Sequence, residues 1–167
     1  MPRLTIAQAL MSERSLLAAQ GYLELGMVEE ALAELVAVHT SAISDPDPDL
    51  IELRLHILMQ GERWSDALSS AEELLQLNSS AIPAYIHGAF ALHELGRTAE
   101  ARDLLLSGPE ILGMDPTYHY NIGCYEAVLG NNESAKQSLK KSFALDETYR
   151  DFAKQDPDLE AIRAELE

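Results

Sequence analysis

Five histidines and one cysteine are the side chains of this chain best suited to metal binding or nucleophilic catalysis. They are His39, His56, His87, His93, His119 and Cys124. A helical zinc site usually places two histidines four residues apart, with a carboxylate as a further ligand. His87 and His93 are six residues apart, so on a helix they point in different directions, and no other pair has the required spacing. The pattern therefore predicts surface or groove histidines and no metal site.

Cys124 would need a general base within hydrogen-bonding reach to act as a nucleophile. His119 and Asn121 are its neighbours in sequence, but a helix places neither of them as a base for the thiol. A free cysteine is most often a small buried apolar residue. The glycines are single residues, and none is followed by the Lys-Ser/Thr pair of a phosphate-binding loop. We therefore expect no enzyme and no cofactor; the alternative is a metal-handling or enzymatic protein that uses His and Cys residues.

The charge balance excludes several classes of partner. The chain of 167 residues has 28 acidic and 12 basic side chains, a formal net charge of −16. Affinity for nucleic acid comes largely from Lys and Arg that displace counterions from phosphates, so this surface repels DNA and RNA. Anionic membrane surfaces are disfavoured for the same reason, and no apolar run reaches the roughly 20 residues of a membrane-spanning helix. A basic protein partner remains compatible with the charge.

The composition indicates a folded, helical chain. Hydrophobic residues make up 47% and aromatic residues 6% of it, and the abundance of Ala and Leu favours helix. The single cysteine leaves no partner for an intrachain disulfide, which is typical of a reducing compartment. We therefore expect a cytoplasmic protein.

A glycine and an alanine recur at a nearly constant spacing in four successive segments. Gly26, Gly61, Gly96 and Gly130 follow one another at a step of roughly 35 residues. A few residues after each glycine stands an alanine, and the alanines recur at nearly the same step. These alanines are Ala31, Ala67, Ala101 and Ala135. Such a period indicates stacked copies of one supersecondary unit.

Each unit is expected to hold two helices joined by a short turn. The glycine ends the first helix, because it adopts the left-handed conformation without steric cost. The alanine lies where the two antiparallel helices cross closely, because a larger side chain would separate them. Prolines mark the starts of helices, where a missing N–H does no harm. They are Pro46, Pro48, Pro83, Pro116 and Pro157.

The fourth unit resembles a known family most clearly. Residues 116–125, followed by Leu129-Gly130 and Ala135, are similar to the tetratricopeptide repeat, a family with a closely matching period. The first and third units contain related residues: Ala18-Ala19, Tyr22, Tyr85 and Gly88-Ala89. The second unit is the most divergent, and its turn is expected to carry one extra residue. The resemblance covers roughly residues 12–146; it implies a fold and says little about function.

The resemblance implies an all-α fold, a right-handed superhelix of about four tetratricopeptide-like hairpins with a C-terminal capping helix. We expect one domain over residues 1–167, with repeats near 12–45, 47–80, 82–115 and 116–146 and a capping tail at 147–167. First helices are expected near 12–25, 48–60, 81–94 and 116–129, and second helices near 28–42, 64–77, 98–107 and 132–145. The stretch from Thr5 is expected to extend the first helix, and residues 156–163 resemble the capping helix itself.

In this family the first helices line a concave groove that usually binds extended peptides or partner helices. Transferring the groove positions onto this chain gives an apolar and aromatic surface with an acid at one end. The positions are Glu13, Leu16, Gln20, Leu23, Ile51, Leu55, Leu58, Ile86, Phe90, His93, Tyr120, Cys124 and Ala127. If the register of the second unit slips by one, it contributes Glu52, His56 and Met59 instead. Coverage of some positions by the chain's own N-terminal extension or tail is the alternative to use by a partner.

One branch of the family holds the C-terminal carboxylate of its ligands with Lys, Arg and Asn side chains in the groove, through charge-assisted hydrogen bonds. Only Arg14 and Arg54 lie on the expected first helices, and Asn121 matches a single slot of that clamp. We therefore do not expect this chain to hold its partner by such a clamp.

The repeats and the lack of a catalytic constellation predict a protein–protein interaction module. It is a scaffold, or a chaperone-like adaptor, that binds another protein or peptide in the groove, with a basic partner favoured by the charge. A small acidic chaperone and a scaffold for a multiprotein complex are the narrower hypotheses. Association of the chain with itself, through the groove or an end repeat, is a further hypothesis.

Overall fold

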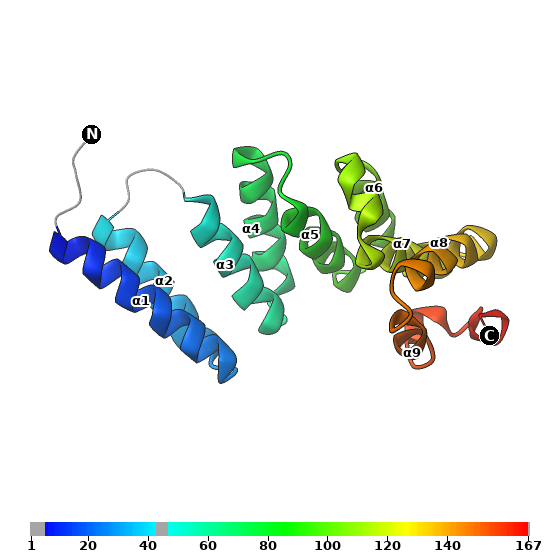
Figure 1. Cartoon of the computed structure of the whole chain (residues 1–167), viewed down its shortest axis with the longest axis horizontal. Helices are drawn as coiled ribbons and strands as arrows, with labels where there is room; N and C mark the ends of the chain where they lie inside the picture. The colour runs from blue at the N-terminus through cyan, green and yellow to red at the C-terminus, as the bar shows by residue number, and fades with distance from the viewer. Residues whose placement is uncertain (1–5, 43–46, 167) are drawn as a thin grey trace. The chain divides into compact units, whose positions relative to one another are not determined.

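The computed structural model describes the backbone of residues 6–42 and 47–166 and the side chains of residues 13–36 and 47–166. Throughout these residues the regular elements are helices, arranged as consecutive packed pairs (Figure 1). The chain divides into two compact units, residues 1–79 and 80–167, which we call unit 1 and unit 2 and describe separately. The predicted all-α fold of successive helix hairpins is confirmed. The superhelical sense and the single domain stay predictions.

Unit 1 consists of two helix hairpins. Its helices are α1 (Ile6–Glu24), α2 (Val28–Ala42), α3 (Pro48–Gln60) and α4 (Trp64–Leu77). The bounds agree closely with the predicted ranges, and α1 extends toward the N-terminus as expected. Apolar residues of α1, α2 and α3 form one core cluster, namely Ala19, Leu23, Ala31, Leu35 and Ile57.

Unit 2 consists of two further hairpins and a tail. Its elements are α5 (Ile82–Glu94), α6 (Thr98–Leu106), the 3₁₀ helix η1 (Glu110–Met114), α7 (Pro116–Val128), α8 (Asn132–Leu145), α9 (Tyr149–Ala153), and the 3₁₀ helices η2 (Pro157–Leu159) and η3 (Arg163–Glu165). The helix α6 is short, as predicted from Ser107-Gly108-Pro109, and the predicted linker after it contains η1. Leu105, Leu112, Leu139, Leu159 and Ile162 are among its fully buried side chains.

Three of the four periodic glycines occupy the predicted left-handed turn position. Gly26, Gly96 and Gly130 have φ values of 71°, 75° and 82°. Each is the middle residue of a three-residue turn between two helices of one hairpin. The glycine therefore ends the first helix for the expected reason, because a Cβ is strained in this conformation.

The second hairpin departs from the prediction of an extra turn residue. Its turn also has three residues, and its left-handed position is Glu62, with φ 54°. Gly61 has φ −83°, and a Cβ built on it would lie 2.6 Å from Cγ1 of Val28. A glycine is therefore needed at position 61 because Val28 of α2 packs directly against it. Glu62 adopts the left-handed backbone conformation of the turn, which is unfavourable for a residue with a Cβ. The periodic glycine stands one residue before the turn position, which explains the misjudged turn length.

The four periodic alanines lie at the close helix crossings, as predicted. Ala31, Ala67, Ala101 and Ala135 are each 0% exposed. In the last hairpin the approach is so close that a Cβ on Gly123 of α7 would lie 2.6 Å from Cγ of Leu139 on α8. Small residues on both sides therefore set the distance between the paired helices.

Asp-Pro pairs start three of the helices. The carboxylates of Asp47, Asp115 and Asp156 accept hydrogen bonds from the backbone N–H two residues later, at 3.0, 2.7 and 3.0 Å. The proline that follows each of them occupies a position where no N–H is needed. Pro46, also predicted to mark a helix start, lies outside the described residues.

The tail of unit 2 differs from the predicted capping helix over 156–163. A short helix, α9, lies earlier, and residues 156–163 form 3₁₀ turns. Leu159 and Ile162 are 0% and 1% exposed, and a three-residue spacing places both side chains on one face of a 3₁₀ turn. Nη2 of Arg163 donates a hydrogen bond to the backbone oxygen of Asp156 at 2.7 Å, which closes the segment.

Candidate functional site

The turn residues set a common register for the groove positions of the four first helices. Apart from Glu13, the predicted positions on α1, α5 and α7 lie ten, six and three residues before the left-handed turn residue. Counted in the same way from Glu62, the equivalent residues of α3 are Glu52, His56 and Met59. The structure thus aligns the slipped register of the second repeat with the other three.

In unit 1 the predicted positions are divided between surface and core. Glu13 and Gln20 are exposed, Leu16 is half-buried, and Leu23 belongs to the core cluster. On α3, Ile51, Leu55 and Leu58 are 5%, 0% and 4% exposed. The aligned residues of the slipped register are more accessible, because Glu52 and His56 are exposed and Met59 is half-buried. Use of these positions by a partner stays a prediction.

Unit 1 also has a hollow that the sequence did not indicate. Its volume is about 600 Å³, and it is walled by α2, α3 and α4, with no lining residue from the described part of α1. Leu32, Leu35 and the 63% exposed Val36 form its α2 wall. Arg54 lies on the opposite wall, where Nε donates to Oγ of Ser70 at 3.0 Å and Nη2 pairs with Glu73. Two predicted groove residues, Ile51 and Leu58 of α3, line this hollow, while the predicted positions of α1 do not.

In unit 2 one groove position of α5 and two of α7 contact the tail. The hydroxyl of Tyr120 donates a hydrogen bond to Oδ2 of Asp156 at 2.7 Å, and Sγ of Cys124 lies 3.5 Å from the same oxygen. Nε2 of His93 lies 2.9 Å from Oδ2 of Asp158. Tyr120, Cys124 and Ala127 are 7%, 4% and 6% exposed. The tail therefore covers these positions, which is the self-coverage that the sequence left open.

Two predicted positions on α5 are less covered. Ile86 and Phe90 are half-buried and stand one turn apart on the helix. With His93 they form a strip of α5 that runs toward the tail. We call Ile86, Phe90, His93, Tyr120 and Cys124 the groove strip of unit 2.

Burial and the two tail carboxylates together set the electrostatics of this strip. The hydrogen bond to Asp158 raises the pKa of His93, against the lowering effect of its burial. Burial, with the nearby charges of Asp156 and Asp158, raises the pKa of the Cys124 thiol well above its usual value. The thiol is therefore protonated at neutral pH, which disfavours a nucleophilic role for it.

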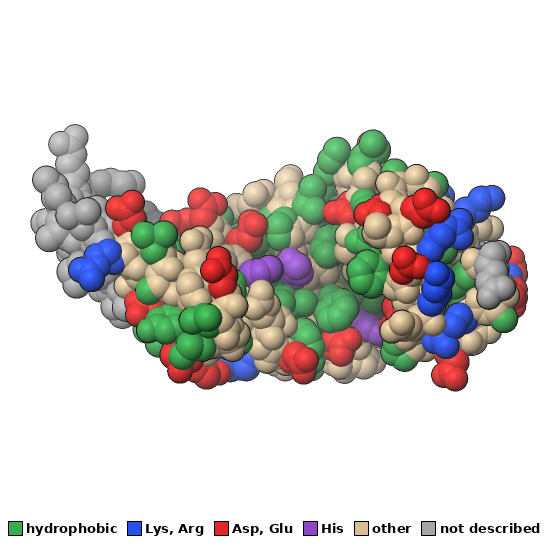
Figure 2. Space-filling view, turned by 60° about the horizontal axis from the view of Figure 1, so that its bottom comes forward, with side chains coloured by type: hydrophobic (Ala, Val, Ile, Leu, Met, Phe, Trp, Pro, Cys, Tyr) green, Lys and Arg blue, Asp and Glu red, His purple; other side chains and the backbone are tan. Residues whose placement is uncertain are grey.

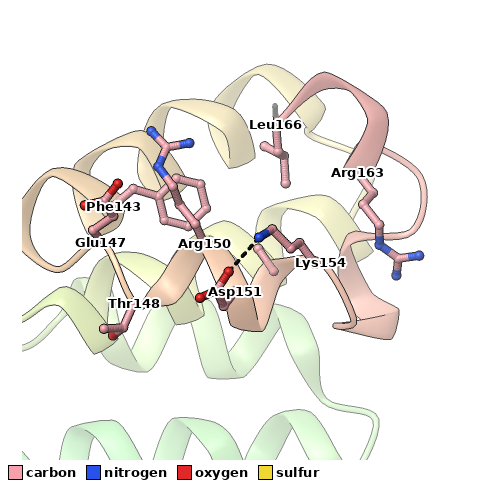
Figure 3. Close-up of a pocket in the computed structure, with 9 residues that line it drawn as sticks. Phe143, Glu147, Thr148, Arg150, Asp151, Lys154, Arg163 and Leu166 are labelled. Atoms are coloured by element: carbon pink, nitrogen blue, oxygen red, sulfur yellow. Dashed lines mark hydrogen bonds and ion pairs between the residues drawn. The ribbon is translucent and has the colours of Figure 1, made fainter.

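A second hollow lies at the end of unit 2, with a volume of about 700 Å³ (Figure 3). The guanidinium of Arg150 lies 4.9 Å from the ring centroid of Phe143, and Nζ of Lys154 pairs with Asp151 at 2.6 Å. Arg163 and Leu166 of the tail complete the lining. Figure 2 shows basic side chains gathered over this C-terminal end, although the chain as a whole is acidic.

The remaining histidines are not part of the groove strip. Nε2 of His119 lies 2.9 Å from the backbone oxygen of Gly113. His87 is half-buried and His56 exposed, and the side chain of His39 lies outside the described residues.

Sequence reasoning missed two residues of this site, Asp156 and Asp158. Both belong to the tail and reach the groove strip from far along the chain, beyond the helices that carry Cys124 and His93. Periodicity along helices carries no signal for such long-range contacts.

Among the described residues, no helix combines the length and the apolar character that a bilayer crossing requires. Neither a known family model nor a curated protein sequence matches this chain.

Solved structures resemble the chain over most of its length. MamA (residues 41 to the end) from Desulfovibrio magneticus RS-1 has a TM-score of 0.76 at 17% identity, covering 93% of this chain and 90% of that one. YrrB, described as a TPR protein with an unusual peptide-binding site, has a TM-score of 0.70 at 20% identity, with coverages of 85% and 71%. TTC0263, a thermophilic TPR protein of Thermus thermophilus, has a TM-score of 0.69 at 18% identity, with coverages of 86% and 78%.

These likenesses establish the fold: the chain has the tetratricopeptide-repeat fold.

Proposed function

We propose that this chain is a protein-interaction module, a scaffold or chaperone-like adaptor, that binds a peptide or helix of another protein along its first helices. One observation carries the proposal: the groove strip of unit 2 already holds a polypeptide segment, the chain's own tail. The side chains of His93, Tyr120 and Cys124 contact its carboxylates at 2.9, 2.7 and 3.5 Å.

The way the tail is held supports binding of a short segment. Polar atoms of the strip meet the two aspartates, while Leu159 and Ile162 are buried almost completely. A few anchoring apolar side chains, together with satisfied hydrogen bonds, are also what a bound peptide requires. A partner segment would either replace the tail or lie beside it.

Ile86 and Phe90 are the places where a partner would bind first. Both are half-buried on α5, so part of each side chain faces solvent while the tail stays in place. Their apolar and aromatic character suits a buried anchor on the partner. A peptide on these residues would extend the surface that the tail occupies, without requiring the tail to leave.

Charge favours a basic partner. The formal net charge of −16 steers cationic segments toward the chain and repels acidic ones. We place the protein in the cytoplasm, where its single cysteine stays reduced. A small acidic chaperone and an assembly scaffold are the two forms of this proposal.

Site-specific photo-crosslinking in cells tests the position of the binding surface. A benzoylphenylalanine at Phe90 reports on the groove strip, and one at Leu106, a 56% exposed residue of α6, is the matched control. We expect a discrete cross-linked protein at position 90 and none at position 106. Equal cross-linking at both positions would contradict a groove partner, and a cross-link to a second copy would identify self-association instead.

The captured partner then allows a quantitative test. Ile86→Asp and Phe90→Asp place a charge on the anchor surface, and each is expected to weaken the measured affinity at least about tenfold. Leu106→Asp should leave the affinity unchanged. Circular dichroism verifies that each variant is folded; folded variants with full affinity would refute binding along α5.

A further inference from the structure

Four metal-ligating side chains meet where the tail crosses the first helices of unit 2. They are His93 from α5, Cys124 from α7, and Asp156 and Asp158 from the tail. Nε2 of His93 is 2.9 Å from Oδ2 of Asp158, and Sγ of Cys124 is 3.5 Å from Oδ2 of Asp156. One ligand atom from each of Cys124, Asp156 and Asp158 lies within 4.8 Å of the other two. His93 stands outside this mutual group and contacts it through Asp158.

These separations are close to those of a tetrahedral zinc site. Zinc–sulfur bonds of about 2.3 Å and zinc–nitrogen or zinc–oxygen bonds of about 2.0–2.2 Å place neighbouring donor atoms roughly 3.3–3.7 Å apart. The 3.5 Å between Cys124 and Asp156 falls in this range, and the 2.9 Å between His93 and Asp158 lies below it. Small side-chain shifts would bring the thiolate and the two carboxylates around one ion. The imidazole of His93, now paired with Asp158, would have to turn from that carboxylate to the ion to become the fourth ligand.

The ligand side chains are oriented by their neighbours. Nδ1 of His93 lies 3.0 Å from Oγ1 of Thr98, which is 8% exposed, so the ring is held with Nε2 toward the tail. Tyr120 donates its hydroxyl hydrogen bond to Asp156 at 2.7 Å. Hydrogen bonds of this kind typically orient the ligands of metal sites.

Two polar groups beside the cluster do not compensate its carboxylates. Arg163, the nearby cation, donates to the backbone oxygen of Asp156 and to neither carboxylate of the cluster within the described residues. The hydroxyl of Tyr125 is buried without a hydrogen-bond partner among the described residues, although its ring lies 4.9 Å from that of His93. Buried polar groups are usually satisfied, so an unpartnered hydroxyl beside this cluster is consistent with an ion or an ordered water there.

We propose that His93, Cys124, Asp156 and Asp158 bind one zinc ion, which fastens the tail to α5 and α7. A thiolate with an imidazole and carboxylates is a donor set that suits zinc, and hard cations such as Mg²⁺ disfavour sulfur. On binding, the metal–sulfur bond forms as the S–H bond of Cys124 breaks, and the proton passes to solvent. His93 binds through Nε2 and donates from Nδ1 to Thr98.

This site needs no partner protein, so it stands apart from the proposed interaction function. Failure of the zinc experiment leaves the crosslinking result unaffected, and the reverse also holds. The proposal also explains why donors from α5, α7 and the tail lie close together where the tail crosses these helices.

Cobalt substitution of the purified, reduced full chain tests the proposal. Cys124 is the only cysteine, so a thiolate-to-cobalt charge-transfer absorption reports on this site alone. We expect that band to saturate at one equivalent of Co²⁺ and to disappear when Zn²⁺ is added. Absence of the band, or cobalt uptake without it, would overturn the proposal.

Matched variants complete the test. Cys124→Ser keeps a hydroxyl that can donate to Asp156, and it should abolish the band and weaken zinc binding at least about tenfold. Asp158→Asn should weaken zinc binding similarly. His119→Gln and Asp151→Asn alter a histidine and an acid outside the cluster and should bind as the wild type does. Equal zinc affinity in Cys124→Ser and wild type would also overturn the site.

Discussion

Asp156 is the residue that ties the tail of unit 2 to its helices. Its Oδ1 accepts a hydrogen bond from the backbone N–H of Asp158 at 3.0 Å, and its Oδ2 accepts one from Tyr120 at 2.7 Å. The carboxylate thus stabilises both the local turn and the long-range contact. Loss of one partner should loosen the tail measurably while the hairpins remain folded.

Tyr120→Phe removes the hydroxyl that meets Asp156 and keeps the aromatic ring. Hydrogen bonds to charged groups contribute about 1.5–3 kcal/mol, so we expect a loss of roughly this size in the free energy of unfolding, measured with urea. Tyr118→Phe is the control, since the Tyr118 hydroxyl forms no hydrogen bond to any described residue. If both variants lose the same stability, the contact with Asp156 contributes nothing.

Asp146 should give the stability a defined dependence on acid pH. Hydrogen bonds from the side chain and backbone of Thr148, at 2.7 and 2.9 Å, lower the pKa of this carboxyl. A lowered folded-state pKa contributes stability that is present above the unfolded value, about 3.9, and lost as pH falls through the folded value. The melting temperature of Asp146→Ala should therefore lie below that of wild type at pH 5–7.

The same melting experiment, repeated from pH 5 down to pH 3, checks the sign of this effect. We expect the difference between Asp146→Ala and wild type to shrink as the carboxyl of the wild type becomes protonated. Asp146→Asn keeps an acceptor for Thr148 and does not titrate, so its difference from Asp146→Ala should change little over this range. If the difference in melting temperature between Asp146→Ala and wild type stays constant down to pH 3, Asp146 is not the group whose protonation lowers the stability.

At the scale of the elements, hairpin geometry depends on small residues at the turns and crossings. Gly26, Gly96 and Gly130 supply the left-handed turns, while Gly61 supplies space for Val28. The two roles have different consequences for substitution. A turn glycine is needed for its backbone conformation, and a packing glycine for its missing side chain.

Gly61→Ala should destabilise unit 1 by about 1–3 kcal/mol, because the added Cβ would meet Val28 at 2.6 Å. Val28→Ala removes the opposing methyl groups, so the double variant should lose less stability than the sum of the two single losses. Urea unfolding of the four proteins gives the coupling energy, expected at about 1 kcal/mol. If the loss of stability in the double variant equals the sum of the two single losses, residues 28 and 61 are not in steric conflict in Gly61→Ala.

Glu62→Gly should stabilise unit 1. The left-handed conformation costs a residue with a Cβ about 1–2 kcal/mol, and the greater freedom of glycine in the unfolded chain offsets part of the gain. We expect a net increase of about 0.5–1 kcal/mol in urea unfolding. Glu147→Gly, in a loop where φ is not positive, should give no increase. A loss of stability in Glu62→Gly would indicate that its side chain, and not its backbone, matters.

At the scale of the whole molecule, charge is the dominant feature. The 28 acidic residues outnumber the 12 basic ones by more than two to one, so the net interaction among the surface charges is repulsive. Described pairs such as Arg63 with Glu29 and Asp66 are exposed, and exposed pairs of this kind contribute little to stability. Repulsion should therefore outweigh pairing in the response to salt.

Raising NaCl from about 10 to 300 mM shortens the screening length from about 30 Å to below about 8 Å. We expect the melting temperature to rise by a few degrees, because screening relieves repulsion among the carboxylates. Choline chloride at the same ionic strength is the control and should act alike if screening is the cause. A falling melting temperature would show that the ion pairs dominate instead.

The sequence by itself determined the helices and their pairing. The nearly constant step between alanines located Ala31, Ala67, Ala101 and Ala135 at the crossings, where each is fully buried. Turn glycines and helix-starting prolines gave bounds close to those observed. These features are local or periodic, because a helix end or a close crossing requires particular residue types at particular offsets.

Only the tertiary structure decided where the tail lies and how α3 is registered. His93 and Asp158 stand far apart in the sequence, and no period or motif links them. Likewise, Gly61 stands near the periodic position, and only its packing against Val28 shows that Glu62 makes the turn. Such contacts depend on how side chains from different helices pack against one another in three dimensions. Local and periodic patterns in the sequence do not predict this packing.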